Sequence, residues 1–279
     1  MAALSVHIGL NRVSPAHYGS EQRLRGAVPD ARAMKAIADA QGFASTLLLD
    51  DAATVLAVSR AVSQAAARLG AGDTFFLSYA GHGSQLFDGG GDEPDSVDET
   101  LCLFDRMLLD DEVHGLLARF EAGVRVLVIT DSCHSATATR LMTKPDKDEF
   151  AKGGVGPTYP EADDLRFRNI EEHVARDIYA ANAARYDEAR LLALPQRQLA
   201  LRCAKIHLAA CQDDQLAADA PNNGYFTSQL LFHWANGAFA GSYRDLFRAL
   251  EQAMPRRQRP NLETGGDAAA FVAGRPFAT

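Results

Sequence analysis

Short apolar segments that alternate with helical patterns are the feature that most constrains how this chain can fold. Five of these segments are predicted to be strands: residues 4–10, 44–49, 74–79, 124–130 and 205–210. Helical patterns lie between them at residues 30–40, 54–69 and 110–120. This alternation is typical of an α/β fold, in which a mostly parallel central sheet is covered by helices on both faces. With 279 residues and 47% hydrophobic content, the chain can bury one large core.

The regular alternation stops in the middle of the chain. From about residue 141 to 200 the sequence is first loop-like and then helical, at residues 170–194. Two further helices are expected at residues 225–239 and 242–253, and residues 100–104 are expected to add a small hairpin. We therefore divide the chain into residues 1–140, a linker or insertion at 141–200, and residues 201–279, which together form one domain.

Composition excludes several classes of function. The net charge of −8 argues against a nucleic-acid partner, because phosphate contacts need clustered Lys and Arg. No apolar run is long enough for a membrane span, and the N-terminus lacks the features of a signal peptide, so we expect a cytoplasmic protein with no membrane partner. The four cysteines form no CxxC pair, which indicates reduced thiols instead of a disulfide framework or zinc site.

Two predicted strands each end at a residue suited to covalent catalysis. The fourth strand leads into Cys133 and the third leads into His82. A thiol nucleophile and its base require such a placement, since the carboxyl ends of parallel strands meet at one edge of a sheet. Cys133 as an ordinary core cysteine is the alternative, but that role needs no partner histidine. The other three cysteines, Cys102, Cys203 and Cys211, are interpreted as structural.

The residues around this pair resemble a known family. The segments are Tyr79-Ala80-Gly81-His82-Gly83-Ser84-Gln85 and Asp131-Ser132-Cys133-His134-Ser135, and the spacing of 133 − 82 = 51 residues is similar to that of caspases. They resemble the metacaspase and orthocaspase branch of the caspase-like clan, and the similarity extends over nearly the whole chain.

The resemblance implies a caspase-like fold, in which residues 1–140 are large-subunit-like and residues 201–279 are small-subunit-like. It also implies a cysteine endopeptidase with a Cys133–His82 dyad, in which the backbone N–H groups of Gly83 and Cys133 bind the developing oxyanion. We expect a monomer that acts on protein or peptide substrates.

Specificity is predicted from the strand period. Asp131 lies two residues before Cys133 and therefore on the same side of the strand. A buried carboxylate needs a cation, and no basic residue adjoins Asp131 in sequence, so the substrate is a candidate for that cation. Asp30 lies near the expected start of the first helix and is either a helix cap or part of the same pocket. The resemblance implies the second role, with Asp30 and Asp131 binding Arg or Lys before the scissile bond.

An acidic segment precedes the third helix. Residues 88–112 carry ten carboxylates and a single basic residue, Arg106. The segment is either a solvated loop or a calcium site, because calcium prefers clustered carboxylate oxygens. The resemblance implies that Asp98, Asp110 and Asp111 bind an activating calcium ion, although a further aspartate of the family is replaced by Arg140 here.

Self-processing is a further expectation. Loop-like sequence between residues 140 and 168 carries six basic residues at which a protease specific for Arg or Lys could cut its own chain: Arg140, Lys144, Lys147, Lys152, Arg166 and Arg168.

The sequence leaves one other function open and disfavours a second. A caspase-like binding or scaffold module with little proteolysis remains open. A flavodoxin-like small-molecule binder is disfavoured, because the first strand is not followed by a glycine-rich phosphate loop.

Overall fold

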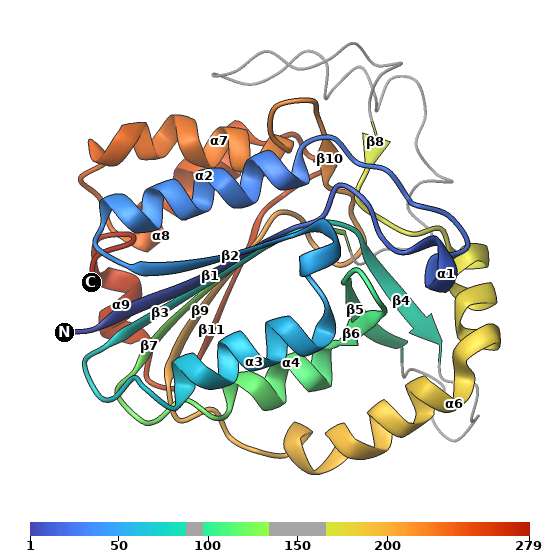
Figure 1. Ribbon diagram of the computed structural model, residues 1–279. Helices are drawn as coiled ribbons and strands as arrows, with labels where there is room; N and C mark the ends of the chain where they lie inside the picture. The colour runs from blue at the N-terminus through green and yellow to red at the C-terminus, as the bar shows by residue number, and fades with distance from the viewer. Residues whose placement is uncertain (88–96, 134–165) are drawn as a thin grey trace.

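A six-stranded sheet forms the centre of the protein (Figure 1). The computed structural model describes residues 1–87, 97–133 and 166–279. The strand order is β11-β9-β7-β3-β1-β2. The strands are β1 (Ala3–Gly9), β2 (Ala44–Leu49), β3 (Thr74–Ala80), β7 (Arg125–Asp131), β9 (Ala204–Ala209) and β11 (Asn261–Gly265). All neighbours are parallel except β11, which pairs antiparallel with β9 at the edge.

Helices cover both faces of this sheet, because successive strand residues point to opposite sides. In β3, Phe75 and Leu77 belong to one core cluster and Phe76 belongs to the other. Helices α3 (Val55–Ala66) and α4 (Asp110–Leu117) cover the first face. The second face is covered by α2 (Ala27–Ala40), α7 (Tyr225–Trp234), α8 (Tyr243–Ala253) and α9 (Ala269–Ala273) (Figure 1).

Smaller elements lie beside the carboxyl ends of the central strands (Figure 1). A three-stranded antiparallel sheet consists of β4 (Gly83–Phe87), β5 (Val97–Cys102) and β6 (Met107–Leu109). A two-stranded ribbon pairs β8 (Arg166–Phe167) with β10 (Ala218–Asp219). The remaining elements are α1 (Pro15–Tyr18), the long helix α6 (Glu172–Arg197), and two 3-10 turns at Asp50–Ala52 and Ala235–Gly237.

The predicted α/β architecture is confirmed, with two differences. All five predicted strands are present, but β11 was not predicted. The predicted helix cap at Asp30 is wrong: α2 begins at Ala27 with Gly26 at its N-cap, so Asp30 lies inside the first turn. Thr54, by contrast, does cap α3, since its side chain accepts a hydrogen bond from the Ala57 N–H.

The described part of the predicted linker is packed against the domain. Residues 141–165 lie outside the described residues, as does the predicted boundary at residue 140. Helix α6 buries Ile178, Tyr186 and Ala189 in the first core cluster. The Tyr186 hydroxyl also accepts a hydrogen bond from the Met107 N–H at 3.2 Å. In the described part of the chain, no helix combines the length and apolar character needed to cross a membrane.

Candidate active site

The candidate dyad lies where β3 and β7 end side by side. Ala80 is in register with Asp131, so the chain segments that carry His82 and Cys133 leave the sheet at the same edge. Gly83 follows His82 and lies directly against the Cys133 backbone: a Cβ atom on Gly83 would lie 1.8 Å from the Cys133 carbonyl oxygen. Glycine is therefore required at position 83 for the two segments to approach this closely.

His82 is buried and held in one orientation by the backbone. Its Nε2 lies 2.8 Å from the carbonyl oxygen of Gln22, and a carbonyl oxygen can only accept, so Nε2 carries the proton. No group in the described part of the chain forms a hydrogen bond with Nδ1. Burial lowers the pKa of His82 to about 4, although the Gln22 carbonyl and Asp219 oppose the shift. At neutral pH His82 is therefore uncharged, with the Nδ1 lone pair free to take a proton.

The Cys133 thiol is buried against the backbone of Ala217. Its Sγ accepts a hydrogen bond from the Ala217 N–H at 2.7 Å and donates to the Ala217 carbonyl oxygen at 3.5 Å. The thiol proton is therefore directed to Ala217 and not to His82 in this conformation.

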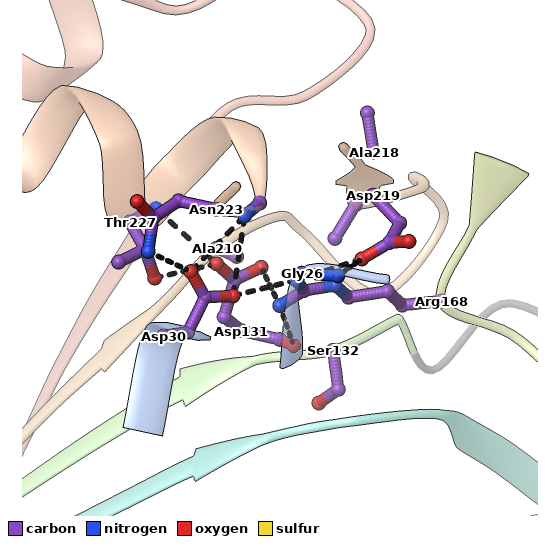
Figure 2. A network of polar contacts seen from close by, with 12 residues as sticks. Gly26, Asp30, Asp131, Ser132, Arg168, Ala210, Ala218, Asp219, Asn223 and Thr227 are labelled. Carbon is purple, nitrogen blue, oxygen red and sulfur yellow. Dashed lines mark hydrogen bonds and ion pairs between the residues drawn. The ribbon is translucent and has the colours of Figure 1, made fainter. Parts of the chain in front are cut away.

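Arg168 supplies the cation that the sequence left missing (Figure 2). Its guanidinium is fully buried between three carboxylates, with ion-pair distances of 2.5 Å to Asp30, 3.0 Å to Asp131 and 3.0 Å to Asp219. Burial alone would lower the pKa of Arg168, but Asp131, Asp30 and Asp219 outweigh it and raise that pKa. Asp30 and Asp131 thus lie around one guanidinium, which comes from within the chain, and their role in binding a substrate stays a prediction.

The Arg168 backbone is hydrogen-bonded at both its N–H and its carbonyl group. Its carbonyl oxygen accepts hydrogen bonds from the N–H groups of Gly83 at 2.9 Å and Cys133 at 3.1 Å. Its own N–H donates to the Ala217 carbonyl oxygen at 3.0 Å, which extends the β8–β10 ribbon by one residue. Arg168 is therefore held with its side chain in the acidic pocket and its carbonyl group between two converging N–H donors.

The pocket holds a surplus of negative charge, which two helix N-termini offset. At the start of α7, the Gly224 N–H donates to Asp30 and the Thr227 N–H donates to Asp131. Just before α2, the Gly26 N–H donates to Asp219. These groups carry the positive end of each helix dipole. Even so, the pKa of Asp30 is raised to about 7: burial is the largest cause, Arg168 opposes it, and Asp131 adds to the rise.

Three parts of this site were missed from the sequence alone. Asp219 and Arg168 lie far from Cys133 along the chain, and their pairing depends on the tertiary fold. Gln22 acts through its backbone carbonyl, which no side-chain motif can indicate. Its φ of 44° lies in the left-handed region that non-glycine residues seldom adopt.

The predicted calcium ligands lie on β5 and α4, away from the pocket. The Asp98 carboxylate already has a cation, because the Arg190 Nε of α6 donates to it at 2.6 Å. Burial raises the pKa of Asp110 to about 6, with Asp111 and Asp98 adding to the shift. Among the described residues, no group of three such side chains is arranged to hold a metal ion. Four further acidic residues of the segment, at positions 88–95, lie outside the described residues.

Sequence comparison identifies the family. The family model described as "Caspase domain" matches residues 12–268. The chain belongs to the caspase domain family. Metacaspase-1 of Schizosaccharomyces pombe is 29% identical over 216 residues, which cover 68% of this chain and 49% of that protein. Metacaspase-1 of Mycosarcoma maydis is 25% identical over 281 residues, which cover 92% of this chain and 69% of that protein. The resemblance to metacaspases is thereby confirmed, although the chain spans only about half to two thirds of their length.

Solved structures agree on the fold. The crystal structure of protein GSU0716 from Geobacter sulfurreducens is 40% identical, covers 100% of this chain and 99% of its own, and has a TM-score of 0.84. Caspase-1 from Spodoptera frugiperda has a TM-score of 0.55 at 10% identity, covering 95% of this chain and 87% of its own. The caspase-like fold predicted for this chain is therefore confirmed.

Removal of Arg168 should destabilise the protein in a pH-dependent way. In a Cys133→Ala background, Arg168→Gln leaves three buried carboxylates without their cation, so we expect the free energy of unfolding at pH 8 to fall by about 3–5 kcal/mol. Without Arg168 the pKa of Asp30 rises further, and the folded variant then binds a proton that the unfolded chain does not. The loss should therefore shrink as the pH is lowered from 8 to 6.

Denaturant titration at the two pH values measures this difference. Arg166→Gln in the same background is the matched control, because Arg166 is exposed and its effect should stay within about 0.5 kcal/mol at both values. Equal, pH-independent effects of the two substitutions would show that the buried ion cluster is not as described.

Proposed function

We propose that this chain is a cysteine endopeptidase that cuts after Arg or Lys, with Cys133 as nucleophile and His82 as base. The observation that carries the proposal is the placement of Arg168. Its guanidinium lies among the acidic side chains while its carbonyl oxygen lies between the N–H groups of Gly83 and Cys133. A substrate arginine bound in this way would present its carbonyl carbon to the nucleophile.

The chemistry follows from the same contacts. The thiol turns from Ala217 and transfers its proton to Nδ1 of His82, as Sγ attacks the carbonyl carbon. Negative charge then develops on the oxygen held by the Gly83 and Cys133 N–H groups, which are already aimed at it. The imidazolium protonates the departing amine, and water hydrolyses the thioester. Gln22 keeps the His82 ring in the required orientation and tautomer.

Selectivity for Arg over Lys is expected from the geometry of the pocket. Its three carboxylates approach the guanidinium from different sides: Asp30 and Asp219 pair with one terminal nitrogen and Asp131 pairs with the other. A planar guanidinium can satisfy several acceptors at once, whereas an ammonium group is a single point charge. Lys should therefore bind in the same pocket, but less tightly.

Self-processing is proposed at the bond between Arg168 and Asn169. Of the six basic residues expected to be cleavage sites, Arg140, Lys144, Lys147 and Lys152 lie outside the described residues. Arg166 is exposed and bonds to the Arg23 carbonyl oxygen, away from the pocket. Arg168 supports the proposal, because its carbonyl oxygen accepts hydrogen bonds from the Gly83 and Cys133 N–H groups, as that of a residue before a scissile bond would.

Calcium stimulation is proposed as a competition with Arg190. The oxygens of Asp98, Asp110 and Asp111 are the hard ligands that calcium prefers, but the arrangement described does not form a ready site. An ion would have to replace Arg190 at Asp98, which would free α6 from β5. Helix α6 begins only four residues after Arg168, since 172 − 168 = 4.

The first prediction of the proposed function concerns substrate specificity. Asp131→Asn should lower kcat/KM on arginyl peptides by roughly 30-fold to several thousand-fold, because truncation of a buried charge partner commonly costs about 2–5 kcal/mol. Asp214→Asn, at an exposed position two residues after Gln212, is the control and should have no effect. Profiling of a peptide library measures both. A preference for cleavage after Asp, or arginyl cleavage indifferent to Asp131→Asn, would refute the pocket assignment.

Two further measurements distinguish a peptidase from a binding or scaffold module. Cys133→Ala and His82→Ala should each remove cleavage, and an arginyl chloromethylketone should label Cys133 in the wild type. A chain with no turnover and no labelled cysteine would favour the scaffold.

The second prediction concerns self-cleavage. Incubated wild-type protein should yield a fragment that begins at Asn169, and Cys133→Ala should not. Arg168→Gln should abolish that fragment, whereas Arg166→Gln should retain it. Intact-mass and N-terminal analysis decides the matter: a fragment at Asn169 in Arg168→Gln, or its absence from prolonged wild-type incubations in which peptides are still cleaved, would contradict the assignment.

The third prediction concerns calcium. Millimolar calcium should raise the peptidase activity above that in chelator, and magnesium should substitute poorly because it demands a tighter octahedral shell. Arg190→Gln should lower the calcium concentration required for half-activation by about threefold or more, since the competing cation is gone. Arg176→Gln, an exposed change on the same helix, should leave it unchanged. Equal activities in calcium and chelator would mean that the acidic segment is only a solvated surface.

A further inference from the structure

A second cysteine lies beside the candidate nucleophile. Strands β7 and β9 are adjacent and parallel, with Thr130 in register with Ala209, and the pairing continues through the Ala210 N–H, which donates to the Thr130 carbonyl oxygen at 2.9 Å. Two residues further on, the same register places Cys211 next to the segment Ser132-Cys133. The Cys211 thiol confirms this, because it donates to the Ser132 carbonyl oxygen at 3.4 Å.

The two thiols share one enclosed environment. Both are almost completely buried, and both belong to the core cluster on the second face of the sheet. Each contacts the same short backbone segment: Cys211 Sγ lies 3.6 Å from the Gln215 carbonyl oxygen, an alternative acceptor for its one proton, and Cys133 Sγ bonds to Ala217. The pKa of Cys211 is raised well above that of an ordinary thiol. The interaction with the Cys133 thiol is the largest cause, and burial is the second.

The spacing suits a disulfide. Neighbouring strands lie about 4.8 Å apart, and one step along a strand adds about 3.3 Å. Cys133 and Cys211 lie beyond the last strand residues, Asp131 and Ala209, so the alternation of sheet faces does not hold for them, and both side chains belong to the second-face cluster. An offset of one step between neighbouring chain segments corresponds to Cα atoms about 5.8 Å apart, within the roughly 4.4–6.8 Å that a disulfide spans. The remaining cysteines, Cys102 and Cys203, belong to the cluster on the opposite face of the sheet.

We propose that Cys133 and Cys211 form a reversible disulfide when the protein meets a hydroperoxide, so that the nucleophile is stored in an inactive but recoverable form. The inference rests on the proposed function only in taking Cys133 as the nucleophile.

The reaction balances with the hydroperoxide as oxidant. The Cys133 sulfur attacks the nearer peroxide oxygen, the O–O bond breaks, and the thiol proton leaves with the departing alcohol or water, which gives a sulfenic acid. The Cys211 sulfur then attacks the sulfenic sulfur and forms the S–S bond. Its proton combines with the expelled hydroxide to give water. Two thiols thus lose two electrons in total, and the peroxide gains them.

The order of the two steps follows from the contacts of the pair. Cys211 holds its proton at neutral pH, so it is a poor first nucleophile, whereas Cys133 has a neutral histidine base at the same edge of the sheet. Cys133 is therefore the thiol oxidised first and Cys211 is the resolving thiol.

Mass spectrometry of non-reduced digests tests the bond without reference to activity. The protein is treated with hydrogen peroxide, alkylated and digested. We expect a peptide pair joined through Cys133 and Cys211, which is lost in Cys211→Ser and in Cys211→Ala and kept in Cys203→Ser. Absence of the linked pair from oxidised, folded wild type would overturn the proposal. Detection of the pair in a protein without peptidase activity would instead overturn the proposed function and leave the thiol pair standing.

Recovery of activity tests the protective role. Each protein is compared with its own untreated sample after peroxide and then dithiothreitol. Wild type and Cys203→Ser should regain at least about fivefold more activity than either Cys211 variant, because a sulfenic acid without a resolving thiol proceeds to sulfinic and sulfonic acids that dithiothreitol does not reduce. Equal recovery in all four proteins would overturn the protective role. Two different substitutions at Cys211 ensure that misfolding of one does not decide the result.

Discussion

The buried ion cluster around Arg168 is the interaction on which the arrangement of the site depends. Its three carboxylates come from α2, the end of β7 and the end of β10, and the arginine comes from the segment before α6. Three buried carboxylates without a cation would be strongly unfavourable, so the guanidinium holds four parts of the chain together at one point. The N-termini of α2 and α7 are directed at the same charges, which ties the positions of both helices to the cluster.

This cluster also marks the limit of prediction from sequence. The sequence indicated that a buried Asp131 would need a cation, and the structure supplies one. Nothing local to Asp131 could identify that cation, because Arg168 is 37 residues away along the chain. Asp30 was predicted to be in the pocket or at a helix cap, and only the observed start of α2 at Ala27 distinguishes the two. Features that depend on nearby residues can therefore be predicted from the sequence, whereas the long-range pairing of Arg168 with its carboxylates cannot.

Backbone groups contribute to the site alongside the side chains, and their contribution is hard to predict from a sequence. Gln22 orients His82 through a carbonyl group in a left-handed turn, and Ala217 holds both the Cys133 thiol and the Arg168 N–H. Gly83 is an exception, because the clash that any Cβ would cause with Cys133 restricts the position to glycine. The sequence could thus indicate where two backbones approach, but not which carbonyl groups point into the site.

The β8–β10 ribbon has a consequence for any peptide that arrives from outside. Arg166 and Phe167 pair with Asp219 and Ala218, so the acidic pocket and the strand edge beside it are filled by a segment that is covalently attached to the protein. A tethered ligand competes with a free peptide as an intramolecular partner, at an effective concentration set by its connection to the protein. A hydrolysed bond after Arg168 would not by itself vacate the pocket, since the new carboxyl end would still belong to the chain that carries Cys133. For a foreign peptide to bind in the same place, the β8–β10 ribbon would have to separate, so the stability of that pairing would set the affinity that the peptide must exceed.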